Sequence, residues 1–338
     1  MTIDCRLRSE ALVVAQRCLC LALLWLPLLA HGGWESLDHE AMGTRIHAEA
    51  WHADPEIARR ALAEVQTEMQ RIDAAFSPYR EDSELSFLNR EASKGWTQVS
   101  AELIRLLTAS QRVSELTEGA FDVTFASAGR YYDYRRGEAP DQATLDSAVE
   151  GIDYRHIEID AARQRVRFKH AATYVDLGGI AKGYAVDRAA TIFAAAGIRE
   201  ASVSAGGDTR ILGDRRGQPW VVGVQHPRDT KKMAVRLPLS DTAISTSGDY
   251  ERFFVQDGVR YHHIIDPTSG SSAAGSMSVT ILGPSGIFTD ALSTSVFVLG
   301  AAKGMALINQ MPGIDGIIID AAGNMTYSDE LVPPTAAP

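Results

Sequence analysis

Two stretches of the chain repeat apolar residues every three or four positions, a spacing that predicts amphipathic helices. The first begins at an N-cap aspartate, Asp54, with a proline in its first turn, and its apolar face continues to Phe76. The second begins near Ser100 and stops at Gly119. The segment 77–83 between them is polar, so we expect it to be a surface loop.

Other segments alternate apolar and polar residues, a period of two that predicts strands. Residues 157–168 are expected to form a hairpin. A strand at 174–177 is expected to run through Gly178-Gly179 into a helix that ends at 196–197. Further strands are expected at 201–204, 220–225, 253–256, 259–265, 277–282 and 316–320, with a tight turn at Asp257-Gly258.

Long helices mixed with strands that lack a regular βαβ alternation indicate an α+β fold. We find no internal repeat and no linker rich in Pro, Gly or Ser that would divide the chain. Residues 31–330 are therefore expected to form a single domain, and residues 331–338, which are rich in proline and alanine, a loose tail.

The N-terminus carries an apolar run, from Cys18 to Ala30, preceded by Arg6, Arg8 and Arg17. The run is shorter than the roughly 20 residues that a helix needs to cross a bilayer, and it has the length of a signal-peptide core. We therefore expect residues 1–30 to be an export signal and the rest of the chain to be periplasmic. An uncleaved N-terminal anchor, and with it membrane association, is the alternative. No cysteine follows the run, so a lipid anchor is not expected.

Composition narrows the chemistry that the chain can perform. Of the 338 residues, 45% are hydrophobic, which is ample material for a core, and the formal net charge is -10. A surface that acidic has no electrostatic reason to hold a nucleic-acid backbone. The cysteines lie at positions 5, 18 and 20, so the rest of the chain has no thiol for a disulfide, a zinc site or a nucleophile. Catalysis must use oxygen and nitrogen groups.

Two glycine-rich segments follow strand patterns. In 176–184, Asp176 and two glycines precede a helix with Lys182 in its first turn, which would place backbone N–H groups and positive charge at one spot suited to phosphate. The alternative is an ordinary tight turn with Asp176 as the helix N-cap. Gly206-Gly207 would let the backbone approach a ligand closely, although neither segment matches a Walker A loop or a dinucleotide-binding motif.

Two further sets of side chains are candidates for chemistry. Asp290 and Thr294 are four residues apart at the start of a predicted helix, which puts two hard oxygen ligands of the kind that Mg²⁺ prefers on one helical face. The alternative is that Thr289 or Asp290 caps the helix. His262 and His263 lie in one predicted strand, so they face opposite sides, and only one can act as a general base in a pocket. No zinc-type spacing of histidines occurs.

These segments and four others follow one another along the chain in a fixed order. The order is Met42-Gly43-Thr44, 76–89, Gly119-Ala120-Phe121-Asp122, 176–187, Ala205-Gly206-Gly207-Asp208, Ser245-Thr246-Ser247-Gly248, 263–270 and 289–294. In this order and composition the chain resembles the ApbE family, the FAD:protein FMN transferases, from about Met42 to about Asp320. The resemblance implies an α+β, T-fold-related architecture with an FAD cleft. One side of the cleft would be a helical part, roughly residues 40–150, and the other a strand-rich part that contains the metal site.

The resemblance also implies a reaction and the residues that serve it. FMN from FAD would be joined through a phosphodiester bond to a Thr or Ser of an exported acceptor flavoprotein, with AMP as the leaving group and Mg²⁺ as the metal. His263 would deprotonate the acceptor hydroxyl, and Mg²⁺ would be held by Asp290, Thr294 and the backbone carbonyl of Gly179. The residues implied to bind FAD are Met42, Ala120, Phe121, Asp122, Asp176, Lys182 and the backbone around Ile265.

Two other functions use the same residues. A related hydrolase, an FAD pyrophosphatase, would cleave FAD to FMN and AMP with water in place of the acceptor. A flavin-binding or assembly protein would hold the flavin without catalysis. The sequence does not separate the transferase from the hydrolase, because acceptor and water would compete for one position.

Overall fold

The structure, a computed structural model, describes residues 32–331 and contains an antiparallel sheet of eight strands in the order β1-β2-β6-β7-β10-β13-β14-β15. The expected export signal and tail residues 332–338 lie outside the described residues. The strands are β1 (Gly33–Ala41), β2 (Thr44–His52), β6 (Glu200–Ala205), β7 (Asp208–Leu212), β10 (Ala243–Gly248), β13 (Ser276–Gly283), β14 (Asp315–Asp320) and β15 (Met325–Tyr327).

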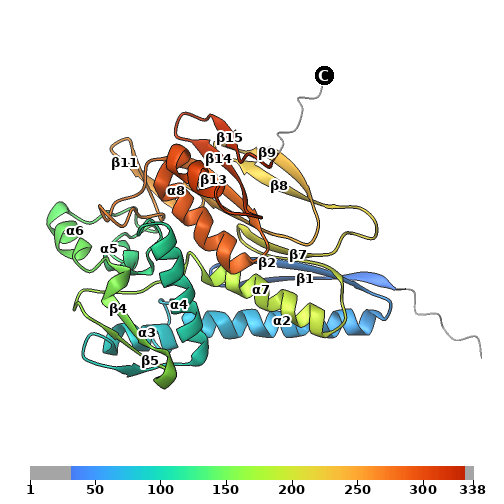
Figure 1. The fold of residues 1–338 in the computed structure, drawn as a ribbon, viewed down its shortest axis with the longest axis horizontal. Coiled ribbons are helices and arrows are strands. Elements are labelled where there is room, and N and C mark those ends of the chain that lie inside the picture. The colour runs from blue at the N-terminus through green and yellow to red at the C-terminus, as the bar shows by residue number, and fades with distance from the viewer. Residues whose placement is uncertain (1–31, 332–338) are drawn as a thin grey trace, which may run out of the picture.

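Three long helices cover one face of this sheet (Figure 1). They are α2 (Pro55–Phe76) against β1 and β2, α7 (Ala181–Ala195) against β6 and β7, and α8 (Gly286–Ile308) against β10, β13 and β14. The α7 helix also contacts both α2 and α8, so it is the middle helix of the layer. The hydrophobic core lies between this layer and the sheet.

The opposite face of the sheet is covered by a long hairpin of β8 (Trp220–His226) and β9 (Asp229–Leu239). Its apolar side chains pack on residues from β10, β13 and β14, in a cluster that contains Val224, Val235, Leu237, Ile244, Leu282 and Ile317. Alternate residues of β10 therefore point to opposite layers, one set to the hairpin and the other to α8.

A separate helical part is inserted between α2 and α7. It contains α3 (Glu84–Glu91), α4 (Ala101–Leu116), α5 (Ala126–Gly129), α6 (Gln142–Val149), the 3-10 turns η1 (Val123–Phe125), η2 (Tyr154–His156) and η3 (Ala161–Arg163), and a small sheet of β3 (Thr97–Gln98), β5 (Arg165–Phe168) and β4 (Ile157–Asp160). The expected span of this part, residues 40–150, is too early at its start. Residues up to Phe76 belong to the main sheet and its helical layer.

A second hairpin, β11 (Phe253–Gln256) and β12 (Val259–His262), belongs to the strand-rich part and packs against the helical part. Phe254 and Tyr261 stack with their ring centroids 5.1 Å apart. Their rings meet those of Tyr134 and Tyr132 of the helical part at 5.9 and 6.4 Å. Aromatic contacts of this kind hold the base of the hairpin in place.

The predicted α+β fold is confirmed, and most of its predicted elements are present. The helix from Asp54 to Phe76 has its aspartate cap, which accepts a hydrogen bond from the Glu56 N–H, and Ser100 caps α4 in the same way. The predicted hairpin at 157–168 and the turn at Asp257-Gly258 are also observed. The predicted strand 174–177 is wrong, because these residues have no ladder partner, and the strand predicted at 259–265 ends at His262.

The α8 helix is long and apolar enough to cross a membrane by length and composition. Half of its most apolar stretch is buried in the protein, where Val296 and Phe297 pack in the core. This is the environment of a core helix. A non-helical residue, Gly300, kinks it.

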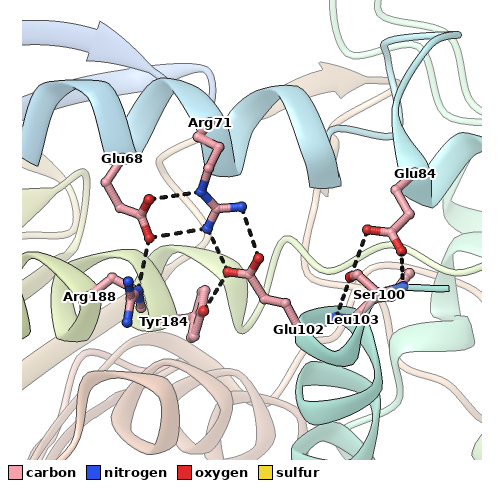
Figure 2. Close-up of polar contacts among 8 residues, drawn as sticks. All are labelled: Glu68, Arg71, Glu84, Ser100, Glu102, Leu103, Tyr184 and Arg188. Carbon is pink, nitrogen blue, oxygen red and sulfur yellow. Dashed lines mark hydrogen bonds and ion pairs between the residues drawn. The ribbon is translucent and has the colours of Figure 1, made fainter. Parts of the chain in front are cut away.

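A network of charged side chains joins α2, α4 and α7 (Figure 2). Glu68 on α2 accepts hydrogen bonds from Arg71 and from Arg188 of α7, each at 2.8 Å. Arg71 also reaches Glu102 of α4, which accepts a further bond from Tyr184 of α7. The hydrogen bonds from Arg71 and Arg188 lower the pKa of Glu68 to about 2, against the opposing effect of burial.

Replacing Glu68 with glutamine should reduce the free energy of unfolding at pH 7 by about 1–2 kcal/mol. The lowered pKa of Glu68 alone corresponds to roughly 3 kcal/mol. The expected loss is smaller because Arg71 and Arg188 are partly exposed, so solvent screens their attraction to Glu68. Because the folded pKa is lowered, the stabilisation is present above the unfolded value near 4.5 and is lost as the pH falls toward 2. Chemical denaturation at several pH values should show the gap between the two proteins narrowing below pH 4.5. Glu64→Gln, at an exposed position one turn away on α2, is the control. A gap that stays constant with pH would contradict the prediction.

Candidate functional site

The site is built where α7 passes very close to the first turns of α8. A Cβ atom on Gly183 would lie 2.1 Å from the carbonyl oxygen of Gly286, so no side chain fits between the two helices. The Gly183 N–H donates to Asp290 Oδ2 at 2.9 Å. One turn further along α7, Asp187 accepts hydrogen bonds from the N–H groups of Gly286 (2.8 Å) and Ile287 (3.1 Å).

This contact sets where α8 starts. The helix begins at Gly286, earlier than the predicted start, and the cap is the side chain of Asp187 from another helix. Neither Thr289 nor Asp290 is the N-cap, so that alternative is wrong. Asp290 Oδ2 instead accepts from the Gly183 N–H, and its other carboxylate oxygen, Oδ1, faces Lys182.

Lys182 lies between two buried carboxylates. Its Nζ is 2.7 Å from Asp208 Oδ2 and 3.5 Å from Asp290 Oδ1. Burial and the nearby Asp208 raise the pKa of Asp290, while the Lys182 ammonium opposes that shift. Although burial disfavours its charge, the two carboxylates raise the pKa of Lys182. Lys182 is in the first turn of α7 as predicted, and its ammonium group is paired with these two carboxylates, so its contact with FAD stays a prediction.

Asp176 does not cap α7, so that alternative is wrong as well. The N-cap position is Ile180, and the Asp176 Oδ1 atom accepts from the N–H of Gly178 at 2.7 Å. Burial raises the pKa of Asp176, against the effects of this bond and of the cations Arg252 and Lys182.

The predicted metal ligands are brought together by the same helix contact. Thr294 is one turn after Asp290 on α8. A Cβ atom on Gly179 would be 3.4 Å from Thr294 Oγ1 and 3.2 Å from the ring of Phe121. Asp290, Thr294 and Gly179 thus offer a carboxylate, a hydroxyl and a backbone carbonyl, which are hard oxygen donors that fit Mg²⁺. Within residues 32–331 no group of three or more His, Cys, Asp and Glu side chains could hold a metal, so any metal here depends on such mixed donors.

The two histidines have different surroundings. His262 is buried, with Nε2 2.8 Å from the carbonyl of Ala273 and its ring edge-on to Phe297. His263 has a buried Nδ1 with no hydrogen-bond partner. Burial, with smaller effects from Arg252 and His262, lowers the pKa of His263 to about 3. The His263 ring is therefore neutral near pH 7, with an unoccupied nitrogen.

Arg252 connects several of the predicted residues. Its carbonyl accepts the His263 N–H at 3.1 Å, which places the two residues opposite each other at the base of the β11–β12 hairpin. The turn Met42-Gly43 between β1 and β2 has φ of 53° and 69°, and a Cβ on Gly43 would lie 3.8 Å from Arg252 Nη2. Arg252 thus lies close to His263 and to Gly43, which follows the predicted Met42, and its positive charge acts on Asp176.

Four of the residues predicted to bind FAD, Ala120, Phe121, Asp122 and Ile265, lie in the helical part or next to it. Asp122 caps η1, where Oδ1 accepts from Thr124 and Oδ2 accepts from the Tyr154 N–H at 2.7 Å, and burial raises its pKa to about 6. Its carboxylate oxygens are therefore engaged within the chain. Ala120 is half-buried beside Phe121, and Ile265 packs in a cluster with Tyr132 of the helical part.

The structure adds residues that the prediction of site residues omits. Asp208, Arg252 and Ser247 all contact predicted site residues. Asp208 directly follows the predicted Gly206-Gly207 turn, and Arg252 is paired with His263 by the register of the hairpin. The glycine turn and the predicted hairpin are therefore the features of the sequence that could have indicated these two positions. Asp208 ends the segment Ala205-Gly206-Gly207-Asp208 that carries part of the family resemblance, but its contact with Lys182 is a tertiary contact that no local pattern predicts.

A hollow of about 460 Å³ lies beside α5 and α6. Its lining includes Arg130, Tyr131 and Asp141, and none of the predicted site residues. The FAD cleft between the helical and strand-rich parts therefore stays a prediction.

Comparison with known proteins gives a consistent family. The chain matches the ApbE family over residues 42–318. The curated FAD:protein FMN transferase of Treponema pallidum is 35% identical over 277 residues, which cover 77% of this chain and 76% of the relative. The FAD:protein FMN transferase of Vibrio cholerae is 36% identical over 263 residues, covering 73% and 78%.

Solved structures show the same likeness in three dimensions. The ApbE protein of Thermotoga maritima matches with a TM-score of 0.81 at 35% identity, covering 88% of this chain and 97% of that chain. The flavin transferase ApbE from Vibrio cholerae matches with a TM-score of 0.79 at 30% identity, covering 88% and 98%.

Replacing Gly183 with alanine should separate α7 from α8. The added methyl group meets backbone atoms, which cannot move aside as a flexible side chain can, so we expect a loss of about 3 kcal/mol in the free energy of unfolding. Thermal or denaturant unfolding measures this loss. Gly33→Ala, in a strand where the added Cβ has open space, is the matched control. Equal stability of the two variants would show that the close helix contact is not required.

Proposed function

The chain belongs to the ApbE family, and we propose that it transfers FMN from FAD to a serine or threonine hydroxyl of another protein. Flavin transfer in general follows from the family. The phosphodiester linkage, the release of AMP and the need for Mg²⁺ are our proposal. We further propose that the acceptor is an exported flavoprotein that meets this chain in the periplasm, in keeping with the expected export signal.

The observation that carries the proposal is the free, neutral nitrogen of His263. Its Nδ1 is buried without a partner, and a pKa of about 3 keeps the ring unprotonated near pH 7. A neutral imidazole can accept a proton from a hydroxyl, and the hydroxyl becomes a better nucleophile as it loses that proton. His263 is the proposed general base for this reason.

The proposed reaction is balanced without a covalent enzyme intermediate. The acceptor oxygen forms a bond to the phosphorus of the FMN half of FAD, and the bond from that phosphorus to the bridging oxygen breaks. AMP leaves with the bridging oxygen, and the acceptor proton goes to His263. Phosphoryl transfer of this kind needs mainly positioning and neutralisation of charge. The absence of a cysteine from residues 32–331 is consistent with that requirement.

The charged side chains support this chemistry in separate ways. A Mg²⁺ ion held by Asp290, Thr294 and the Gly179 carbonyl would neutralise negative charge on the pyrophosphate. Lys182 fixes the orientation of Asp290 through their 3.5 Å contact, and Asp208 fixes Lys182. Arg252, which is exposed and close to Asp176 and His263, adds a positive charge where the anionic substrate would lie.

Incubation of the full chain with FAD, Mg²⁺ and a candidate FMN-binding acceptor should raise the mass of the acceptor by FMN minus water and release AMP. Both products should fall by at least about 100-fold in His263→Ala, a change typical of the loss of a general base. They should also be lost in Asp290→Asn, which keeps an acceptor for the Gly183 N–H. Mass spectrometry of the denatured acceptor and chromatography of AMP are the measurements.

Asp257→Asn is the matched control for the removal of a carboxylate. Asp257 occupies a left-handed turn position that asparagine tolerates, so the fold and the activity should be unchanged. AMP without any change in acceptor mass, across a panel of acceptors, would indicate the pyrophosphatase instead. Flavin that binds without AMP release, with no effect of His263→Ala, would indicate a protein that only holds the flavin.

A further inference from the structure

A row of hydroxyl groups lies between β10 and α8. On β10, Ser245 and Ser247 point to α8, whereas Thr246 points to the other layer and meets Thr280 at 2.9 Å. Ser245 Oγ is 2.8 Å from Thr289 Oγ1. Ser247 Oγ is 2.8 Å from Ser293 Oγ and 3.3 Å from Thr294 Oγ1. Ser247 thus contacts a residue that we propose as a metal ligand.

The direction of the hydrogen bonds in this row can be worked out from their ends. A hydroxyl has one proton to donate and two lone pairs to accept with. Ser293 donates its proton to the carbonyl of Asp290 at 2.9 Å, so it can only accept from Ser247. Ser247 has then used its own proton, and it can only accept from Thr294. The protons run in one direction, from Thr294 through Ser247 and Ser293 to the Asp290 carbonyl.

This direction determines how Thr294 can act. With its proton directed to Ser247, the Thr294 oxygen presents its lone pairs away from β10, and a cation needs lone pairs from a ligand. Gly179 is a near neighbour of the hydroxyl, because a Cβ atom built on it would lie 3.4 Å from Thr294 Oγ1. The same chain of bonds ends on the backbone of Asp290, the residue that supplies the carboxylate.

We propose that Ser247 is a positioning residue, which orients the Thr294 hydroxyl so that its lone pairs face the divalent cation. The inference rests on the proposed function, because it assumes that Asp290, Thr294 and Gly179 hold Mg²⁺. Ser247 does not touch the ion or the substrate in this scheme. Partners of this kind around a metal site change the metal affinity about 10- to 100-fold when they are removed.

The neighbouring hydroxyl pair provides a matched control. Ser245 is on the same strand, faces the same helix and makes a bond of the same length to Thr289. Thr289, however, donates its proton to the Gly286 carbonyl, so this pair does not lead to Thr294. Ser245→Ala and Ser247→Ala each remove one hydroxyl bridge between β10 and α8, and only the second removes the acceptor for the Thr294 proton.

The experiment is a titration of the full chain and its variants with Mg²⁺ alone, followed by the rise in melting temperature that a bound ion produces. Ser247→Ala should weaken Mg²⁺ binding about 10- to 100-fold, whereas Ser245→Ala should bind Mg²⁺ like the unaltered protein. Ser247→Thr, which keeps a hydroxyl, should restore most of the affinity. In the transfer assay, Ser247→Ala should need more Mg²⁺ for half-maximal rate and should regain its rate at saturating Mg²⁺.

The outcomes separate the role of Ser247 from the existence of the metal site. If Thr294→Ala weakens Mg²⁺ binding but Ser247→Ala behaves like Ser245→Ala, the positioning role is overturned and the metal site stands. If the unaltered protein shows no saturable effect of Mg²⁺, or Thr294→Ala leaves it unchanged, the metal site itself is overturned, and the role of Ser247 with it. A lower melting temperature in both serine variants without a difference in Mg²⁺ affinity would leave only a structural role for the row.

Discussion

The contact of α7 with α8 at Gly183 and Gly286 is the constraint on which the site depends. Because both residues are glycines without a side chain, the two helices approach closely enough for the Gly183 N–H to donate to Asp290. The same approach lets Asp187 of α7 accept hydrogen bonds from the first N–H groups of α8. Helix α7 therefore both sets the distance to α8 and caps its N-terminus. Lys182 of α7 then meets Asp290 of α8, one turn before Thr294, and Gly179 lies in the turn directly before α7. Groups placed on rigid elements hold their geometry better than groups on loops.

The charges at this contact are arranged for geometry more than for stability. Buried ion pairs lose hydration that their mutual attraction only partly replaces, so they are weak evidence of stabilisation. Lys182 with Asp208 and Asp290 instead fixes the position of two carboxylates that would otherwise repel each other. The network around Glu68 has a different function, because it ties the helical part to the helix layer through α4. These two sets of charges therefore separate the chemistry of the site from the attachment of the parts around it.

The sequence predicts the elements whose pattern comes from a single buried face. Helix α2 is one of these, because one side packs on the sheet and the other meets water, and its cap at Asp54 marks the start. Helix α8 is apolar on most sides, so its period is weak and its first turn cannot be located from the pattern. The segment 174–177 alternates like a strand, yet it has no partner. Among the site residues, Asp290 and Thr294 are predictable from their spacing, whereas the pairing of Lys182 with Asp208 depends on where the β6–β7 turn meets α7.

The bond from Gly183 to Asp290 joins residues 107 positions apart in the chain. Contacts of such long range require the closure of a large loop, whose entropic cost must be met before the contact is gained. A nascent chain that has emerged only through α7 carries Lys182 and Gly179 but neither the β10 hydroxyls nor Asp290. The proposed metal site therefore needs residues from both sides of this long loop. A chain in which α8 has not packed on α7 therefore lacks two of the three proposed metal ligands at that place.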